Sequence, residues 1–183
     1  KDSSPGIRSL ALEWLHKNDN PRIREFTIQA LQDPKEVVKK TALEIVAARQ
    51  ITGIEPTLLD MLQKDIDTSS GLRRSIIFAL GKLKTEEAVG SLIGIMQNTE
   101  YDDWTRNQAS SALEHVGGKE IIVPYIKNLA DPNEYVRETA AAYLDRNRET
   151  AVEIITQSRN IEYLALLKHA SEHTKKDFSE LIE

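Results

Sequence analysis

The chain has 183 residues, of which 40% are apolar and 29% charged, a composition that supports a packed core and excludes a disordered chain. Its 24 basic and 29 acidic residues leave a net charge of −5, so nucleic acid is not an expected partner. The absence of cysteine excludes disulfides, thiolate metal sites and a cysteine nucleophile.

No apolar run reaches the roughly 18 residues that a membrane-spanning helix needs, so no membrane partner is expected. The chain starts at Lys1 and not at a methionine, which is compatible with a processed protein or with part of a larger chain. The cytoplasm is the expected compartment.

Short helices are predicted along the whole chain, because the apolar residues recur every three to four positions and no strand pattern of period two occurs. The first begins at Ser4-Pro5. Two later ones are predicted to begin at Asp33-Pro34 and Asp131-Pro132, with Asp as N-cap and Pro as the first helical residue. Three glycines predict helix stops or turns, namely Gly53, Gly117 and Gly118.

Five of these helices follow one template. Its first position is apolar, its second basic, its fifth small or apolar, and its ninth a large apolar residue. The openings of these template helices are Ile7-Arg8, Val38-Lys39, Leu72-Arg73, Thr105-Arg106 (with Thr in the apolar place) and Val136-Arg137, spaced by 31, 34, 33 and 31 residues. A second kind of segment, the intervening helices, lies between them around 56–62, 90–96 and 124–129, and 21–31 fills the first such place. The pattern predicts one domain over 1–183, with regular repeats over about 4–147 and a degenerate C-terminal cap over 148–183.

An acid stands six residues before the basic residue of each template helix. The pairs are Asp2/Arg8, Asp33/Lys39, Asp67/Arg73, Glu100/Arg106 and Asp131/Arg137. We interpret them as a structural ladder of charges between stacked repeats. The alternative, a row of arginines that binds phosphate, is disfavoured because each base has its own acid and the net charge is negative.

With these patterns the chain resembles HEAT-repeat proteins, the short HEAT-like members of the armadillo-type α-α superhelix family. The resemblance is carried by Leu72-Arg73…Leu80-Gly81 for the second helix of a repeat and by Glu55-Pro56-Thr57-Leu58-Leu59 for the first. It implies an all-α, right-handed α-α superhelix, a solenoid of about five helix pairs. Because that family consists mostly of scaffolds, it also implies a non-catalytic interaction module that binds another protein on its concave face.

Enzymatic branches of the same fold are the alternative, either as an enzyme or as an enzyme subunit. Deoxyhypusine hydroxylases need several His-Glu dipeptides for iron, whereas the histidines here are followed by Lys17, Val116, Ala170 and Thr174, so that activity is not expected. Bilin lyases of phycobiliproteins have similar repeats, and no short motif here selects them. Alkylpurine DNA glycosylases use aromatic residues and a carboxylate, the residue types of Tyr101-Asp102-Asp103-Trp104, but on a basic surface that this acidic chain lacks.

His169 and His173 are four residues apart and would share one face of a helix, where Asp177 or Glu180 could add a third metal ligand. A solvated tail helix is the preferred interpretation, so neither a metal nor a cofactor is expected.

Positions 3, 7 and 10 of the template face away from the core. The resemblance to HEAT-repeat proteins implies that these helices line the concave surface, so the three rows are candidate contacts. Phe78 is the large apolar residue in these rows and is either an interface anchor or packed under a neighbouring repeat. Trp14 is expected in the core. The candidate partner-binding residues are Lys40, Arg74, Phe78, Asn107, Glu114 and Glu138.

Overall fold

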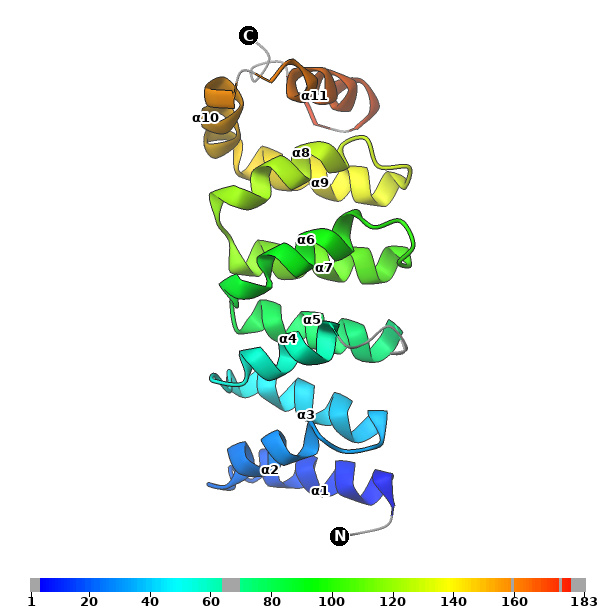
Figure 1. Cartoon of the computed structure of the whole chain (residues 1–183), viewed down its shortest axis with the longest axis vertical. Helices are drawn as coiled ribbons and strands as arrows, with labels where there is room; N and C mark the ends of the chain where they lie inside the picture. The colour runs from blue at the N-terminus through cyan, green and yellow to red at the C-terminus, as the bar shows by residue number, and fades with distance from the viewer. Residues whose placement is uncertain (1–3, 64–69, 159, 175, 179–183) are drawn as a thin grey trace. The chain divides into compact units, whose positions relative to one another are not determined.

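The structure is a computed structural model that describes residues 4–63, 70–158, 160–174 and 176–178 (Figure 1). Within these residues the chain is all-α, as predicted. The helices are α1 (Pro5–Lys17), α2 (Ile23–Ala30), α3 (Glu36–Arg49), α4 (Glu55–Gln63), α5 (Ser70–Lys82), α6 (Val89–Gln97), α7 (Asp103–Val116), α8 (Ile122–Asn128), α9 (Glu134–Arg146), α10 (Arg148–Ser158) and α11 (Ile161–His173), with 3-10 turns η1 (Glu86–Ala88) and η2 (Lys119–Ile121).

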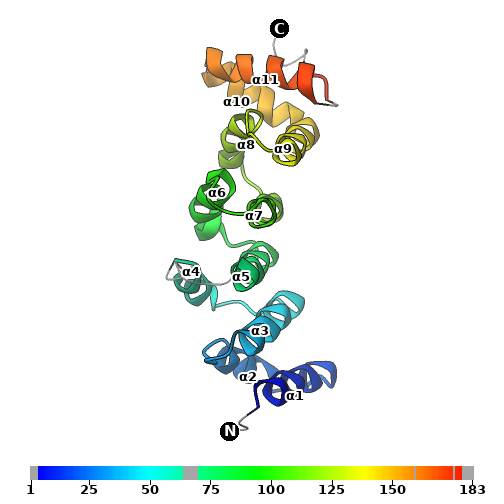
Figure 2. The same ribbon diagram turned by 90° about the vertical axis from the view of Figure 1, so that its right-hand side faces the viewer.

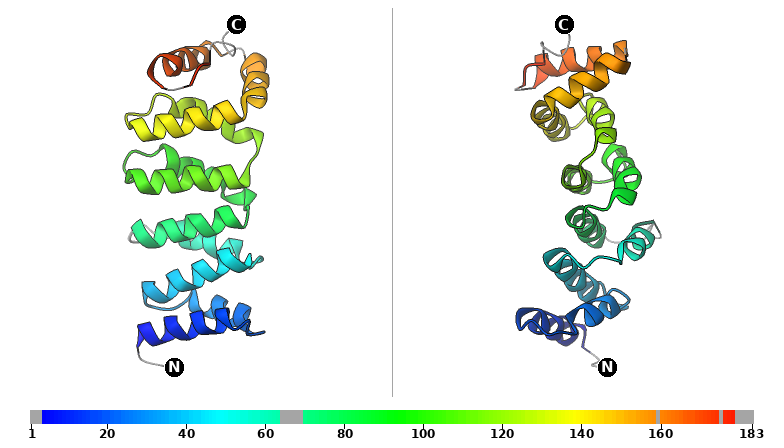
Figure 3. Two further views of the ribbon diagram at one scale, coloured as in Figure 1. Left: turned by 180° about the vertical axis from the view of Figure 1, so that it is seen from behind. Right: turned by 90° about the vertical axis from the view of Figure 1, so that its left-hand side faces the viewer.

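The chain divides into two compact units, residues 1–92 and 93–183, with the boundary inside α6. In the first unit, α3 packs between α1 and α5, and the intervening helices α2 and α4 pack against α3 and α5 (Figure 3). In the second unit, α9 packs beside α7, and α8 packs against α9 (Figure 2). Each unit therefore has one layer of template helices and one layer of intervening helices.

The core of each unit is built from the apolar positions of the template. In α3, Val38, Ala42 and Val46 are at most 2% exposed, and in α9 the equivalent residues are also buried. These positions recur every four residues, so on a helix they form one stripe that turns toward the intervening layer. The periodicity that predicted the helices is therefore the physical reason for the two layers.

The predicted helix starts at Asp33 and Asp131 are wrong by two to three residues. The helices begin at Glu36 and Glu134, and the N-cap of α9 is Asn133, whose side chain accepts a hydrogen bond from the amide of Val136. Each Asp instead accepts the backbone N–H two residues later, so Asp-Pro forms a turn ahead of the helix.

The three glycines predicted as stops have positive φ values of 81° at Gly53, 79° at Gly117 and 110° at Gly118. This left-handed backbone favours glycine and turns the chain between helices.

The predicted C-terminal cap contains α10 and α11, which both pack against α8 of the second unit. Phe178, after the end of α11, is fully buried there. None of the described helices is long and apolar enough to cross a membrane. Trp14, expected in the core, is 62% exposed, because the buried face of α1 is the one that carries Ser9 and Leu12.

Candidate functional site

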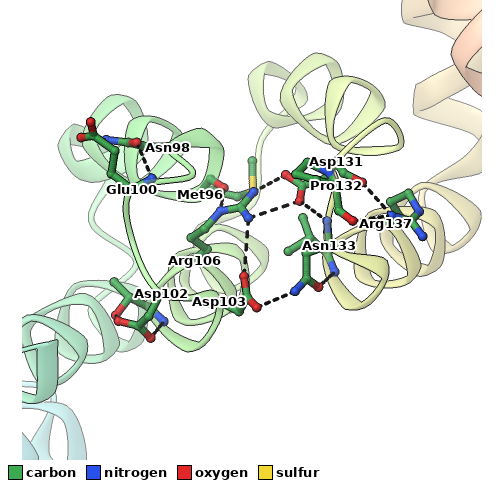
Figure 4. A network of polar contacts seen from close by, with 12 residues as sticks. Met96, Asn98, Glu100, Asp102, Asp103, Arg106, Asp131, Pro132, Asn133 and Arg137 are labelled. Atoms are coloured by element: carbon green, nitrogen blue, oxygen red, sulfur yellow. Dashed lines mark hydrogen bonds and ion pairs between the residues drawn. The ribbon is translucent and has the colours of Figure 1, made fainter.

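The most deeply buried ion pair among the described residues joins Arg106 of α7 to Asp131, in the turn before α9 (Figure 4). The Arg106 side chain is 2% exposed. Its Nη1 donates to Asp131 Oδ1 at 3.2 Å, its Nη2 donates to Oδ2, and its Nε donates to the backbone oxygen of Met96 at 3.0 Å. One guanidinium therefore ties the end of α6, the helix α7 and the turn before α9 together.

The first unit contains the same contact in a more exposed form. Arg8 of α1 donates from Nε to Asp33 Oδ2 and from Nη2 to Oδ1, both at 2.7 Å. This two-pronged hydrogen bond holds the pKa of the Asp33 carboxyl below its usual value. Burial opposes the shift, while the amide of Lys35 and the charge of Lys39 add to it.

These contacts correct the predicted ladder at Arg106, which binds Asp131, the acid 25 residues later, and not Glu100, six residues earlier. Arg8 also binds the acid 25 residues later, Asp33. Glu100, the predicted partner of Arg106, is exposed and accepts from Asn98 Nδ2 at 3.5 Å. Arg137 donates to the backbone oxygens of Asp131 and Pro132 at 2.8 and 3.0 Å.

The cause of the different pairing lies in the Asp-Pro turn. Because the carboxylate accepts the amide two residues later, it is held in the turn and is directed to the template helix of the preceding repeat. Lys39 lowers the pKa of Asp33 through its charge. The remaining predicted pairs involve Asp2 and Asp67, which lie outside the described residues, so the half-buried Arg73 keeps its role only as a prediction.

The predicted partner-binding rows are partly buried, which was not expected. Ser9, Ala47 and Gly81, at template positions 3 and 10, are buried because neighbouring template helices pack side by side there. The Ser9 hydroxyl of α1, for example, hydrogen-bonds to Thr41 of α3. The stripe through positions 3 and 10 thus faces the next repeat and is not uniformly open to a partner.

In the first unit, the predicted partner-binding residues lie on α3 and α5. Lys40 pairs with Glu36 one turn earlier at 2.6 Å, and Arg74 is half-buried. The Phe78 ring is 41% exposed, and Lys82 Nζ lies 5.4 Å from its centroid. Phe78 is therefore not packed under a neighbouring repeat, and its role as an interface anchor stays a prediction.

In the second unit, the predicted residues Asn107, Glu114 and Glu138 are all half-buried. Glu114 accepts from Arg146 Nη2 of α9 at 2.8 Å. This ion pair lies at a hollow of about 500 Å³, whose other lining residues include Tyr143, Asn147 and Thr150. The template did not predict Arg146, Asn147 and Thr150 at this hollow, because these residues follow its last position.

Tyr143, which lines this hollow, stacks on the buried Tyr125 of α8. The rings of Tyr125 and Tyr143 are stacked, with centroids 4.0 Å apart. The Tyr125 hydroxyl is buried and donates to the backbone oxygen of Ser110, and burial raises the pKa of both tyrosines. Both phenols are therefore uncharged at neutral pH. The charged residues that line the hollow are Glu114 and Arg146, which pair with each other, and Lys119, which pairs with Glu153 at 2.7 Å.

The histidine pair at the C-terminus gathers no metal-binding group in the part of the chain that is described. His169 is exposed, the side chain of His173 and Glu180 lie outside the described residues, and the backbone oxygen of Asp177 accepts from Arg148. No group of three or more metal-ligating side chains is present among the described residues.

The carboxylates of the Tyr101–Trp104 segment are both engaged at helix starts. Asp102 is the N-cap of α7 and accepts from the amide of Thr105 at 3.0 Å and from its hydroxyl at 2.7 Å. Asp103 accepts from Asn133 Nδ2 at 2.5 Å. Both carboxylates therefore stabilise helix starts, which agrees better with a structural role of the segment than with a catalytic role as in a glycosylase.

Two layers of paired helices, tied by an Arg–Asp contact from one repeat to the next, define a protein of the helical-repeat class. The family model described as HEAT repeats matches residues 25–114 and 55–145, more than half of the chain. The chain belongs to the HEAT-repeat family, as the sequence patterns predicted.

The chain is also similar to curated proteins named deoxyhypusine hydroxylase. It is 27% identical to the protein of Gallus gallus over 85 residues, which are 46% of this chain and 28% of that protein. It is 25% identical to the human protein over 112 residues, with shares of 61% and 36%, and 24% identical to the mouse protein over 119 residues, with shares of 64% and 39%. The chain thus spans less than half the length of these relatives.

These relatives contradict the expected function of a non-catalytic interaction scaffold, because they are named as an enzyme. The repeat pattern predicts packing and not chemistry, so it does not distinguish a scaffold from an enzyme. The alternative expectation, an enzyme or enzyme subunit on a HEAT-like scaffold, agrees better with the comparisons.

Proposed function

We propose that this chain is an enzyme, or a subunit of an enzyme, built on a HEAT-repeat scaffold. The observation that carries the proposal is the similarity to relatives that are named as an enzyme of deoxyhypusine hydroxylation. Another protein, the partner expected from the sequence, fits this proposal as a substrate or as a second subunit.

The iron implied for the hydroxylase branch does not fit the residues described here. None of the four histidines is followed by glutamate, and the described donors form no group of three. The Nδ1 atom of His16 accepts a hydrogen bond from Arg49 Nε at 2.7 Å, so that nitrogen is already in use. We therefore derive no step through iron. We propose that the chain is an enzyme or an enzyme subunit, and we do not propose hydroxylation of deoxyhypusine as its reaction.

The hollow of the second unit is the place that we propose for a substrate. It offers a carboxylate from Glu114 and a guanidinium from Arg146 side by side, with uncharged Tyr143 beside them. Such a pair can exchange its mutual contact for a ligand that carries both charges, or for one charged group and a water molecule. Asn147 and Thr150 add hydrogen-bonding side chains at the same hollow.

The test is an activity panel on the purified chain, alone and together with any protein that co-purifies with it from its source. The substrates are a protein that carries deoxyhypusine, with ferrous iron added, a phycobilin with an apo-phycobiliprotein, and DNA with an alkylated purine. We expect turnover of one substrate that falls at least tenfold in Glu114→Gln and in Arg146→Gln.

The matched control is Arg22→Gln, which removes an exposed guanidinium of the first unit that is also paired with a glutamate. It should leave turnover unchanged. Absence of turnover in the whole panel, with and without the co-purified protein, would contradict the enzyme proposal. Turnover that all three variants retain would instead remove the hollow as the substrate site.

A further inference from the structure

The first unit contains a hollow of about 540 Å³ at the same place in the repeat as the hollow of the second unit. Each lies where the turn before an intervening helix meets the turn after the next template helix. In the first unit these turns are residues 50–54, before α4, and 83–85, after α5, and both lie on the left-hand side of Figure 1. Because the two hollows are equivalent, the differences between their lining residues indicate what each can bind.

Three carboxylates line the hollow of the first unit, which we call the acidic hollow. They belong to Glu55 at the start of α4 and to Glu86 and Glu87 in η1. Within the described part of the chain, none of these side chains takes part in a hydrogen bond or an ion pair. The basic residue of the lining is the exposed Lys84. Three glutamates and one lysine leave the lining with a net charge of −2, which favours a cationic ligand.

A buried hydroxyl at the same hollow lacks a partner. Thr85 lines the acidic hollow and is 3% exposed, and its Oγ1 atom has no hydrogen-bond partner. Thr85 precedes η1 as its N-cap residue, yet its side chain caps no backbone amide. A buried hydroxyl without a partner is unfavourable, so a ligand that hydrogen-bonds to Thr85 would remove this cost. This hydroxyl is evidence for a ligand that is independent of the carboxylates.

The other walls of the acidic hollow are apolar and are formed in part by Pro56, Leu59 and Leu83. Carboxylates beside apolar walls suit a cation that has a hydrocarbon stem, because the stem can cover the leucines while the charged group meets the acids. A metal ion fits less well, since the described residues contain no group of three or more metal-ligating side chains.

The hollow of the second unit shows which cationic group this place in the repeat accommodates. There, Arg146 Nη2 donates to Glu114 at 2.8 Å, so a guanidinium of the protein itself lies at the hollow. The described lining of the acidic hollow contains no arginine. A guanidinium is planar, has five N–H donors and is less strongly hydrated than an ammonium group, so it can serve several separate carboxylates beside apolar walls.

We propose that the acidic hollow binds the arginine side chain of a partner protein. The guanidinium lies among the carboxylates of Glu55, Glu86 and Glu87, and the aliphatic stem lies along Leu59 and Leu83. The hydroxyl of Thr85 accepts one of the N–H groups. Free arginine is the poorer ligand, because its own α-carboxylate is repelled by the three carboxylates of the lining. This site is in the first unit and is additional to the proposed substrate hollow.

The experiment titrates N-acetyl-arginine N-methylamide into the isotope-labelled chain and follows the backbone amides by NMR. The comparison ligands are the same derivatives of lysine and of uncharged citrulline, and free arginine. We expect shifts concentrated at residues 50–59 and 83–87, and affinity for the arginine derivative about threefold or more above that for the lysine derivative. Added salt should weaken the binding, because it screens the charges.

Two variants test the lining residues. The double variant Glu86→Gln with Glu87→Gln should weaken binding of the arginine derivative about fivefold or more, since it removes two of the three carboxylates. Thr85→Val should also weaken binding, and it should leave the chain folded because a methyl group replaces a hydroxyl that has no partner. The matched control is Glu44→Gln, which removes an exposed carboxylate of α3 outside the hollow and should leave binding unchanged.

Equal affinities for the arginine and citrulline derivatives would overturn the proposal, as would binding that the double variant retains. Tighter binding of the lysine derivative would show that arginine is not the preferred residue. Tighter binding of free arginine would indicate a small-molecule site and would overturn the assignment to a partner protein. None of these measurements depends on turnover, so the proposal can fail or stand separately from the proposed enzyme function.

Discussion

Removal of the Arg106 side chain would leave the carboxylate of Asp131 buried without its partner. The Asp131 side chain is 6% exposed and binds the guanidinium through both oxygens. We expect Arg106→Ala to lower the free energy of unfolding by about 3–5 kcal/mol. Urea denaturation followed by circular dichroism measures this change. Arg106→Met combined with Asp131→Leu should recover most of the loss, since neither charge then remains buried.

Arg22 provides the comparison at the surface. It is exposed and pairs with Glu25 one turn later, where water and salt screen the pair. Arg22→Ala should therefore shift the midpoint very little. A midpoint for Arg106→Ala close to that of Arg22→Ala would show that the buried contact contributes no net stability.

The lowered pKa of Asp33 makes the free energy of unfolding depend on pH. The hydrogen bonds from Arg8 lower its pKa in the folded state below the usual value of 3.8, so the unfolded chain takes up this proton first as the pH falls. The contribution of Asp33 is therefore present above pH 3.8 and is lost as the pH falls through the lower, folded value. Asp33→Asn should unfold at a lower urea concentration at pH 7, and the difference from wild type should shrink toward pH 3. A difference that stays constant over this range would contradict the assignment.

At the scale of the helix, the sequence predicted the template and its buried stripe, because apolar residues that recur every three to four positions lie on one face of a helix. It predicted the start of α1 at Ser4-Pro5 correctly and the starts of α3 and α9 wrongly. Asp33 has the residue type of an N-cap, but it has two other partners available, the guanidinium of Arg8 and the amide of Lys35, and these decide its place. The partner of Arg8 lies in another repeat, so no pattern within one repeat could reveal it.

The candidate site was harder to predict for the same reason. Arg146 is separated from Glu114 by 32 residues, and only the packing of α9 beside α7 brings them together. Trp14 shows the opposite limit. Its template position is buried in the other template helices, whereas the buried face of α1 is the one that carries Ser9 and Leu12.

The N-cap of α9 can be tested as an element. Asn133 accepts from the amide of Val136 and also donates to Asp103 at the start of α7. Asn133→Ala should cost about 1 kcal/mol in the free energy of unfolding, because it removes one acceptor for the unpaired amides of the first helical turn. Thermal and urea denaturation measure the loss. Gln97→Ala, an exposed change at the last residue of α6, is the control and should be close to neutral.

At the scale of the molecule, repeats that contact mainly their neighbours should tolerate the loss of one of them. We expect a chain without residues 67–98 to keep helical circular dichroism and to unfold at a lower urea concentration, since the remaining repeats share one template. Complete loss of the helical signal would indicate a closed core that needs every part, in conflict with a solenoid.

The direction of the Arg–Asp contacts has a consequence for synthesis on the ribosome. In both observed pairs the arginine comes first in the chain, Arg8 before Asp33 and Arg106 before Asp131. The guanidinium of a template helix therefore emerges from the ribosome before the carboxylate that binds it. When an Asp-Pro turn emerges, the arginine that binds it has already emerged. The Arg–Asp contacts can therefore form in order from the N-terminus, before the whole chain has been synthesised.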